Sequence, residues 1–291
     1  MSMVRARLAP YVMIAPAVTM LGVFTVYPAV DLIRLSLTSW NMIDPVKTFV
    51  GFEHYLSLAA DPDFRRVLVN TFLYTGLCVT AGLTVGLALA LWLNRGGALR
   101  GFAQAAVFSP HIVSLVSVSL LWLWMMDPQF GLLNALLVSL GLGRFPWLTH
   151  PDTALASLAL VQVWKNAGYN ALVLIAGLQN IPKELHEAAE LDRASPWHKF
   201  VGVTLPLLSP TAFFLLVVNS IDSFKVFDTI AVMTQGGPVN ATNMLVYYVY
   251  ENAFEYFKIG YASAAGVVLL VLVFVMTFLY FGFISKKIHY R

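Results

Sequence analysis

The sequence predicts an all-α integral membrane protein with six transmembrane helices. Of its 291 residues, 59% are hydrophobic and only 11% are charged, whereas soluble domains carry about 25% charged residues. Six apolar runs, each long enough for a helix to cross a bilayer, explain this composition. The runs cover residues 8–30, 67–94, 101–126, 153–182, 200–221 and 259–285.

The first run, residues 8–30, contains no charged side chain. Its apolar core is longer than the roughly 7–15 residues of a secretory signal peptide, and no small-residue cleavage site follows it. We therefore expect an uncleaved anchor. The predicted organisation is an anchor span with an external segment over residues 1–66, followed by a five-span core over residues 67–285.

The orientation follows from the placement of Lys and Arg, which are enriched in cytoplasmic loops. With the N-terminus in the cytoplasm, ten such residues fall inside and five outside. The inside set is Arg5, Arg7, Arg95, Arg100, Lys183, Arg193, Lys199, Lys286, Lys287 and Arg291, and the outside set is Lys47, Arg65, Arg66, Arg144 and Lys258. This excess predicts that both termini are cytoplasmic.

The segment between the fourth and fifth runs, residues 182–206, is the most charged part of the chain. Pro182 suits the first position of a helix, and Glu184 and Glu187 would lie near the positive end of its dipole. Ser195-Pro196 then predicts the N-cap of a second helix that leads into the fifth run. On the predicted topology this helix-turn-helix segment is cytoplasmic.

Two chemical interpretations of this segment fail on spacing. A zinc-protease helix needs two His residues four apart with a Glu between them, but Glu190 stands four residues after His186. A phosphate-binding loop needs Gly-Lys before Ser or Thr, and the sequence contains no Gly-Lys pair. A simple amphipathic linker remains an alternative, and any ATP hydrolysis must come from another protein.

The segment resembles the cytoplasmic EAA loop of binding-protein-dependent ABC importer permeases. The matching residues are Glu187, Ala188, Ala189, Asp192, Ala194, Phe200, Leu205 and Pro206. The resemblance assigns contact with the ATPase to these residues except Phe200, and also to Arg193, which lies between Asp192 and Ala194. Three further segments are similar to the carbohydrate-uptake branch of that family, whose maltose-type and glycerol-3-phosphate-type members both fit. They are residues 176–182, Thr234-Gln235-Gly236-Gly237-Pro238 and Gly260-Tyr261-Ala262-Ser263-Ala264.

One position departs from the family pattern. Where the family has Gly after the Asp, this chain has Arg193. Either the turn here suits an ordinary residue, or Arg193 adopts a left-handed conformation that costs on the order of 1 kcal/mol.

Polar side chains inside the apolar runs, or in the continuation of the fifth run beyond residue 221, are candidates for the solute path, because they are costly in a membrane. They are His111, Gln162, Lys165, Asn166, Asn219, Asp222 and Ser223. The alternative for each is an interhelical hydrogen bond or a position near the end of a span. Lys165 and Lys225 would suit a phosphorylated solute, or would neutralise Asp222 and Asp228.

The resemblance implies an inner-membrane permease subunit of an ATP-driven importer of a sugar, or of glycerol 3-phosphate or a related polyol phosphate. It implies a second, similar permease, two cytoplasmic ATPase subunits that bind ATP and Mg²⁺, and an external solute-binding protein. The chain itself would bind no cofactor, catalyse no reaction, and contact lipid but no nucleic acid. From other classes, the rivals are a membrane enzyme built on His186 and Glu187, and a proton- or cation-coupled transporter that uses Asp222 or Asp228. The latter usually shows internal repeats, and none is visible.

Overall fold

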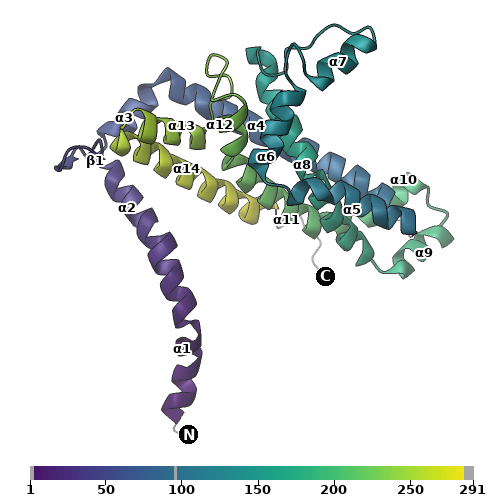
Figure 1. The fold of residues 1–291 in the computed structure, drawn as a ribbon. Coiled ribbons are helices and arrows are strands. Elements are labelled where there is room, and N and C mark those ends of the chain that lie inside the picture. Colours follow the sequence, from purple (N-terminus) through teal and green to yellow (C-terminus); the bar gives the residue numbers. More distant parts are fainter. Residues whose placement is uncertain (1–2, 95–96, 285–291) are drawn as a thin grey trace. The chain divides into compact units, whose positions relative to one another are not determined.

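The computed structural model describes residues 3–94 and 97–284 as two compact units, drawn in Figure 1. One unit comprises Met1–Asp61 and Tyr248–Leu270, and the other comprises Pro62–Tyr247 and Val271–Arg291. Four of the cations used to predict orientation, Arg95, Lys286, Lys287 and Arg291, lie outside the described residues.

The first unit begins with a long helical segment made of α1 (Met3–Leu21), the π-helical turn η1 (Gly22–Val26) and α2 (Tyr27–Ser36). Within it, Pro10–Ser36 is long and apolar enough to cross a membrane. Two short strands follow, β1 (Thr38–Ser39) and β2 (Thr48–Phe49), which pair antiparallel with Thr38 opposite Phe49. The unit is completed by α3 (Glu53–Ala60), η3 (Glu251–Glu255) and the beginning of α14 (Ile259–Leu279).

The start of α14 packs closely on the first strand and its neighbours. A Cβ on Gly260 would collide with the Thr38 carbonyl oxygen, so only glycine permits this approach. The next residue, Tyr261, donates a hydrogen bond from its hydroxyl to Asp61 Oδ2 over 2.9 Å. Ala262 and Ala264 are fully buried. Close packing therefore accounts for the small residues at positions 260, 262 and 264.

The second unit contains the remaining helices, with α13 at its boundary. They are α4 (Pro62–Leu93), α5 (Ala98–Ile112), α6 (Leu115–Met125), α7 (Leu132–Ser139), α8 (Pro151–Gln179), α9 (Lys183–Leu191), α10 (Pro196–Lys199), η2 (Phe200–Thr204), α11 (Leu205–Phe224), α12 (Asp228–Met233), α13 (Leu245–Tyr250) and η4 (Tyr280–Ile284). One apolar cluster joins α4, α8 and α11 through side chains that include Ala90, Leu174 and Leu208. A second cluster joins α4, α6, α8 and α12 around Tyr74, Trp122 and Ile230.

Helix α8 lies at the centre of this packing. It begins at Pro151, where the His150 side chain accepts a hydrogen bond from the backbone N–H of Asp152. It ends at Gln179, with Asn180 as its C-cap, shortly before Pro182. These local signals account for its limits. Buried polar residues along its length, including Gln162, Lys165 and Asn170, lower its mean hydropathy.

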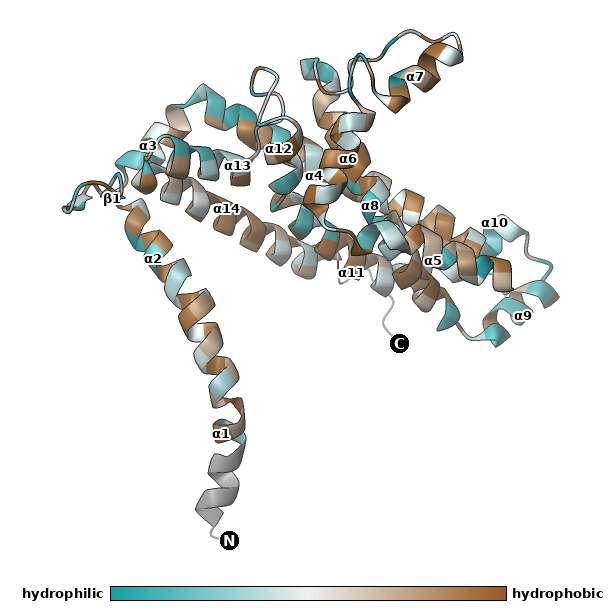
Figure 2. Cartoon of the chain, in the orientation of Figure 1, coloured by the Kyte–Doolittle hydropathy of each residue, from teal (hydrophilic) through white to brown (hydrophobic). Residues whose placement is uncertain are grey.

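Among the described residues, four helices are apolar and long enough to cross a membrane: Pro10–Ser36, Pro62–Leu93, Pro196–Phe224 and Ile259–Phe283. A fifth span is obtained if α5 and α6 count as one. The chain is thus a multi-helix membrane protein, as predicted. Figure 2 shows how strongly the apolar α14 contrasts with the hydrophilic α9.

The apolar run 101–126, expected as one continuous span, is broken. Helix α5 ends at Ile112 and α6 begins at Leu115, with a bend of 98° between them. Val113 and Ser114 are extended, with ψ of 142° and 137°. Pro110 in the last turn of α5 is the sequence feature that is compatible with a break at this point.

One asparagine joins three helices of the second unit. Asn170 on α8 donates from Nδ2 to the Gly82 carbonyl on α4 over 3.2 Å. Its Oδ1 accepts a bond from Asn219 Nδ2 on α11 over 3.1 Å. Asn170 is fully buried, and the sequence analysis did not identify it, although an asparagine in the middle of an apolar run is itself a signal of such a bond.

Candidate functional site

The predicted helix-turn-helix segment is confirmed as local structure. Helix α9 spans Lys183–Leu191 directly after Pro182, as expected. Ser195 caps α10, because its hydroxyl oxygen accepts a hydrogen bond from the backbone N–H of His198 over 3.3 Å. Through η2 the chain then continues into Leu205, Pro206 and α11.

The turn between α9 and α10 is a Schellman motif. The backbone N–H of Ala194 bonds the Ala189 carbonyl, and that of Arg193 bonds the Glu190 carbonyl, both over 3.0 Å. Arg193 occupies the position where this motif needs a left-handed residue, and its φ is +50°. Of the two alternatives for Arg193, the strained one is therefore correct, and the cost is on the order of 1 kcal/mol.

An ion pair ties the two short helices together. Lys199 Nζ donates to Glu190 Oε1 over 2.9 Å. This hydrogen bond and the lysine charge lower the pKa of Glu190 below its usual value. The pair and the Schellman motif act on the same turn, so they hold α9 and α10 in one arrangement.

The outer surface of this segment offers both charges and apolar groups. Glu187, Ala188 and Asp192 are exposed. Leu191 is 85% exposed and Trp197 is 68% exposed. Large apolar side chains left open beside charged ones are typical of protein interfaces.

The polar residues predicted for the solute path come from α5, α8 and α11. Lys165 is only 8% exposed, and its ammonium donates to the carbonyl oxygens of Pro110, His111 and Val113 over 3.3, 2.9 and 2.9 Å. The His111 ring stacks on Tyr169, with centroids 4.7 Å apart. Lys165, His111 and Tyr169 therefore gather where α5 breaks.

Two of these candidates carry a buried polar atom without a partner. Gln162 Oε1 and His111 Nδ1 have no hydrogen-bond partner among the described residues. The Trp122 indole N–H on α6 likewise has no hydrogen-bond partner among the described residues. The Trp122 ring lies edge-on to Trp164, with centroids 5.4 Å apart. Buried polar atoms without partners are uncommon and call for an explanation such as a ligand or water.

The remaining candidates differ in their surroundings. Asn219 is buried and bonded to Asn170, so its amide serves interhelical packing. Ser223 is buried, Asn166 is partly buried and Asp222 is exposed. Asp222 and Lys225 form no ion pair in the part of the chain that the structure describes.

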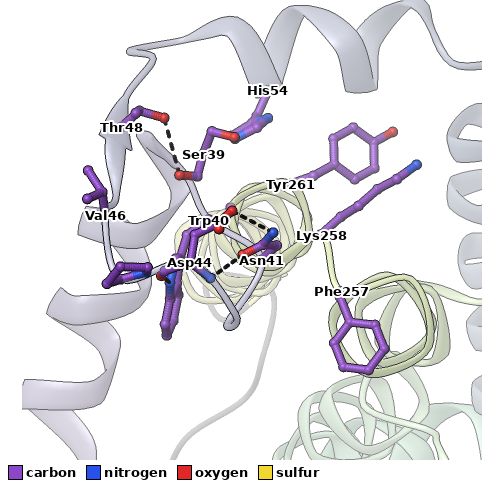
Figure 3. Close-up of a pocket in the computed structure, with 12 residues that line it drawn as sticks. Ser39, Trp40, Asn41, Asp44, Val46, Thr48, His54, Phe257, Lys258 and Tyr261 are labelled. Atoms are coloured by element: carbon purple, nitrogen blue, oxygen red, sulfur yellow. Dashed lines mark hydrogen bonds between the residues drawn. The ribbon is translucent and has the colours of Figure 1, made fainter.

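Two pockets lie away from these seven residues. One, of about 750 Å³, lies in the second unit between the end of α6 and residues 233–238. The other, of about 560 Å³, lies in the first unit and is shown in Figure 3. Its polar groups bond one another: Trp40 Nε1 donates to the Asp44 carbonyl, and Asn41 Nδ2 donates to Asp44 Oδ2.

Comparison with known proteins agrees with this architecture. Residues 82–289 match the family described as "Binding-protein-dependent transport system inner membrane component". The chain is 33% identical to the sulfoquinovosyl glycerol transport system permease protein SmoG of Agrobacterium fabrum, covering 97% of this chain and 92% of that one. It is 34% identical to the sn-glycerol-3-phosphate transport system permease protein UgpA of Yersinia pestis, covering 97% and 96%.

Solved structures are similar over the same length. A chain of a bacterial alginate ABC transporter, in complex with an alginate pentasaccharide-bound periplasmic protein, superposes with a TM-score of 0.82 and 26% identity. The match covers 95% of this chain and 94% of that chain.

Proposed function

The chain belongs to the family of inner-membrane components of binding-protein-dependent transport systems, and on that premise we propose that it is the permease subunit of an ATP-driven carbohydrate importer. The relatives at 33% and 34% identity are named for a sugar-glycerol and for glycerol 3-phosphate. The helix-turn-helix segment at α9 and α10 is the observation that carries the proposal, since it presents exposed charged and apolar side chains and is joined to two long helices.

The proposed topology has six spans with both termini in the cytoplasm. Helix α8, which coincides with the apolar run 153–182, supplies one of the six spans, and its polar residues are buried against neighbouring helices instead of facing lipid. To test this, single cysteines are placed at Thr149 and Arg193 after Cys78 is replaced by alanine. An impermeant thiol reagent applied to intact cells should label only the cysteine at position 149. Labelling at position 193 from outside contradicts the topology.

The proposed partners are a second, similar permease, two cytoplasmic ATPase subunits and an external solute-binding protein. In alternating access, closure of the ATPase pair would move α9, and α8 and α11 would carry that movement to the solute path. The ATPase subunits, which bind ATP and Mg²⁺, supply the energy. The alginate importer complex, which includes a periplasmic protein, supports an external partner of this kind.

Glu187→Lys tests the docking surface. Glu187 is exposed on α9, so reversing its charge should reduce uptake and the yield of ATPase that copurifies with the permease. Glu53→Lys, the same exchange at an exposed position of α3, serves as the matched control and should change neither. Normal uptake with normal copurification in Glu187→Lys contradicts docking through α9.

For the solute path we propose Gln162, His111, Asn166, Asp222 and Ser223. The unpartnered Oε1 of Gln162 and Nδ1 of His111 support this assignment, because sugar hydroxyls both donate and accept hydrogen bonds. Gln162→Leu should raise the solute concentration for half-maximal uptake, whereas Gln129→Leu at an exposed position should not. Lys165 and Asn219 have their polar groups engaged within the protein, which favours packing roles for these two.

The engagement of Lys165 also bears on the class of solute. Its ammonium donates to three carbonyl oxygens, so Lys165 is not the group that would bind a phosphate. Of the two lysines suggested for a phosphorylated solute, the exposed Lys225 remains the candidate. Uptake into proteoliposomes of a labelled disaccharide and of glycerol 3-phosphate, each with its binding protein, separates the two classes of solute.

The experiment that decides the class of transporter identifies the energy source of uptake. Proteoliposomes that contain both permeases and the ATPase pair should take up solute only with ATP on the cytoplasmic side. A protonophore should have no effect on that uptake. Uptake that needs a proton gradient and no ATP would instead identify a cation-coupled transporter.

A further inference from the structure

The break between α5 and α6 leaves carbonyl groups that no helix satisfies. Because Val113 and Ser114 are extended, the last turn of α5 has lost the amide donors of a following turn. In a membrane such groups need partners inside the protein, since lipid offers none. A bend of 98° is thus unfavourable unless something bonds those oxygens.

Lys165 supplies the missing donors. Its ammonium has three N–H groups, and three carbonyl oxygens lie within 3.3 Å of it: those of Pro110, His111 and Val113. The charge also lies at the negative end of the α5 dipole, where a cation is favourable. Lys165 forms no ion pair with a carboxylate in residues 3–94 and 97–284, so the carbonyl groups are its counterpart.

A second contact one turn along α8 fixes α5 beside Lys165. A Cβ on Gly168 would collide with the Val107 carbonyl oxygen on α5. The absence of a side chain therefore lets α5 lie directly on α8. With Gly168 placing the helix and Lys165 bonding its end, the direction in which the chain leaves α5 is determined from α8.

The bend determines where α6 lies. Helix α6 packs against α12, and its end lines the pocket of about 750 Å³ together with Thr234 and Gly237. We propose that Lys165 is a positioning residue that holds the break between α5 and α6 and so places α6 and that pocket. The proposal does not depend on which solute is carried.

The test measures the bend directly. Nitroxide labels are placed at Leu99 on α5 and Leu121 on α6, which are both exposed, in the full chain in lipid nanodiscs with Cys78 replaced by alanine. With a rise of 1.5 Å per residue and the bend of 98°, the two Cα atoms lie about 23 Å apart, against about 33 Å in a straight helix. Pulsed electron–electron double resonance, which measures distances between nitroxide labels, distinguishes these two values.

Lys165→Met keeps an unbranched side chain that is one atom shorter, but removes the donors and the charge. It should lengthen the label distance by up to about 10 Å, or spread it over that range. Lys165→Arg keeps donors and charge, and should restore the original narrow distribution. Lys47→Met, at an exposed lysine that lies over the Trp40 ring, is the matched control and should leave the distance unchanged.

An unchanged distance distribution in Lys165→Met overturns the proposal, and so does failure of Lys165→Arg to restore it. If Lys165→Met cannot be recovered, Lys165→Gln takes its place, with fewer donors and no charge. A broader distribution for Gln than for Arg then supports the proposal, and equal narrow distributions overturn it.

Discussion

The close approach of α5 to α8 makes Gly168→Ala an informative substitution. The added methyl group would meet the backbone of Val107 and Phe108, which cannot rotate away. To restore an ordinary carbon contact of about 3.5 Å, α5 must move by about 1 Å. A movement of that size would also stretch the bonds from Lys165 to the end of α5, which are 2.9 Å long at their shortest.

The size of the effect follows from overpacking, which costs about 1–3 kcal/mol in a closely packed interior. Replacing Gly by Ala in a helix also stabilises the folded state by about 1 kcal/mol, because Ala has the higher helix propensity. A matched control is therefore needed. Gly76→Ala on α4 is suitable, because no atom lies within 4 Å of the added Cβ. The difference between the two variants isolates the overpacking.

The assay is thermal unfolding of the purified chain in detergent, followed by intrinsic fluorescence. With about 2–4 °C per kcal/mol for a chain of 150–250 residues, Gly168→Ala should unfold several degrees below Gly76→Ala. Equal Tm values for the two variants would refute the reasoning, because they would mean that α5 and α8 do not meet at Gly168.

Three further predictions concern other positions. Arg193→Gly should relieve the left-handed strain at φ +50°, because glycine adopts this conformation readily. The free energy of local opening of α9 should rise by up to about 1 kcal/mol, and slower hydrogen exchange of the α9 amides would verify it. Lys199 lowers the pKa of Glu190, so the ion pair is complete above the unfolded pKa and is lost as the pH falls through the folded value. A nitroxide at His198 should therefore become more mobile on acidification from pH 7 to below the usual Glu value of 4.5, whereas in Glu190→Gln its mobility should not change with pH. Gly260→Ala should collide with the Thr38 carbonyl and lower the Tm, whereas Gly22→Ala, whose Cβ meets no atom, should not.

Local signals in the sequence were sufficient for the helix-turn-helix segment. Pro182, Ser195 and Pro196 act within a few residues of themselves, so α9 and α10 follow from their neighbours in the chain. Five of the six apolar runs likewise coincide with long helical segments, because hydropathy is a sum over the residues of each run, whereas the run 101–126 is broken. The cytoplasmic side of the segment and the number of spans stay predictions.

Features that depend on pairing between distant residues could not be predicted in the same way. The run 101–126 is apolar throughout, and the partners that stabilise its break lie 52–55 residues away on Lys165. The sequence shows the charge of Lys165 but not the carbonyl groups around it, so it predicts a solute ligand at this position. The role of Asn170 likewise depends on distant partners. It bonds to Gly82, which lies 88 positions before it, and to Asn219, which lies 49 positions after it.

The hydrogen bonds of Asn170 have a consequence for how the helices of the second unit are connected. The α9 segment is covalently joined to α8 and α11 only, yet Asn170 also fastens α8 to the Gly82 carbonyl of α4. Gly86 on α4 lets the two helices approach closely at the same place, because a Cβ on Gly86 would overlap the side chain of Asn170. These contacts connect α4 to the same packed group as α8 and α11, although no loop joins α4 directly to the α9 segment.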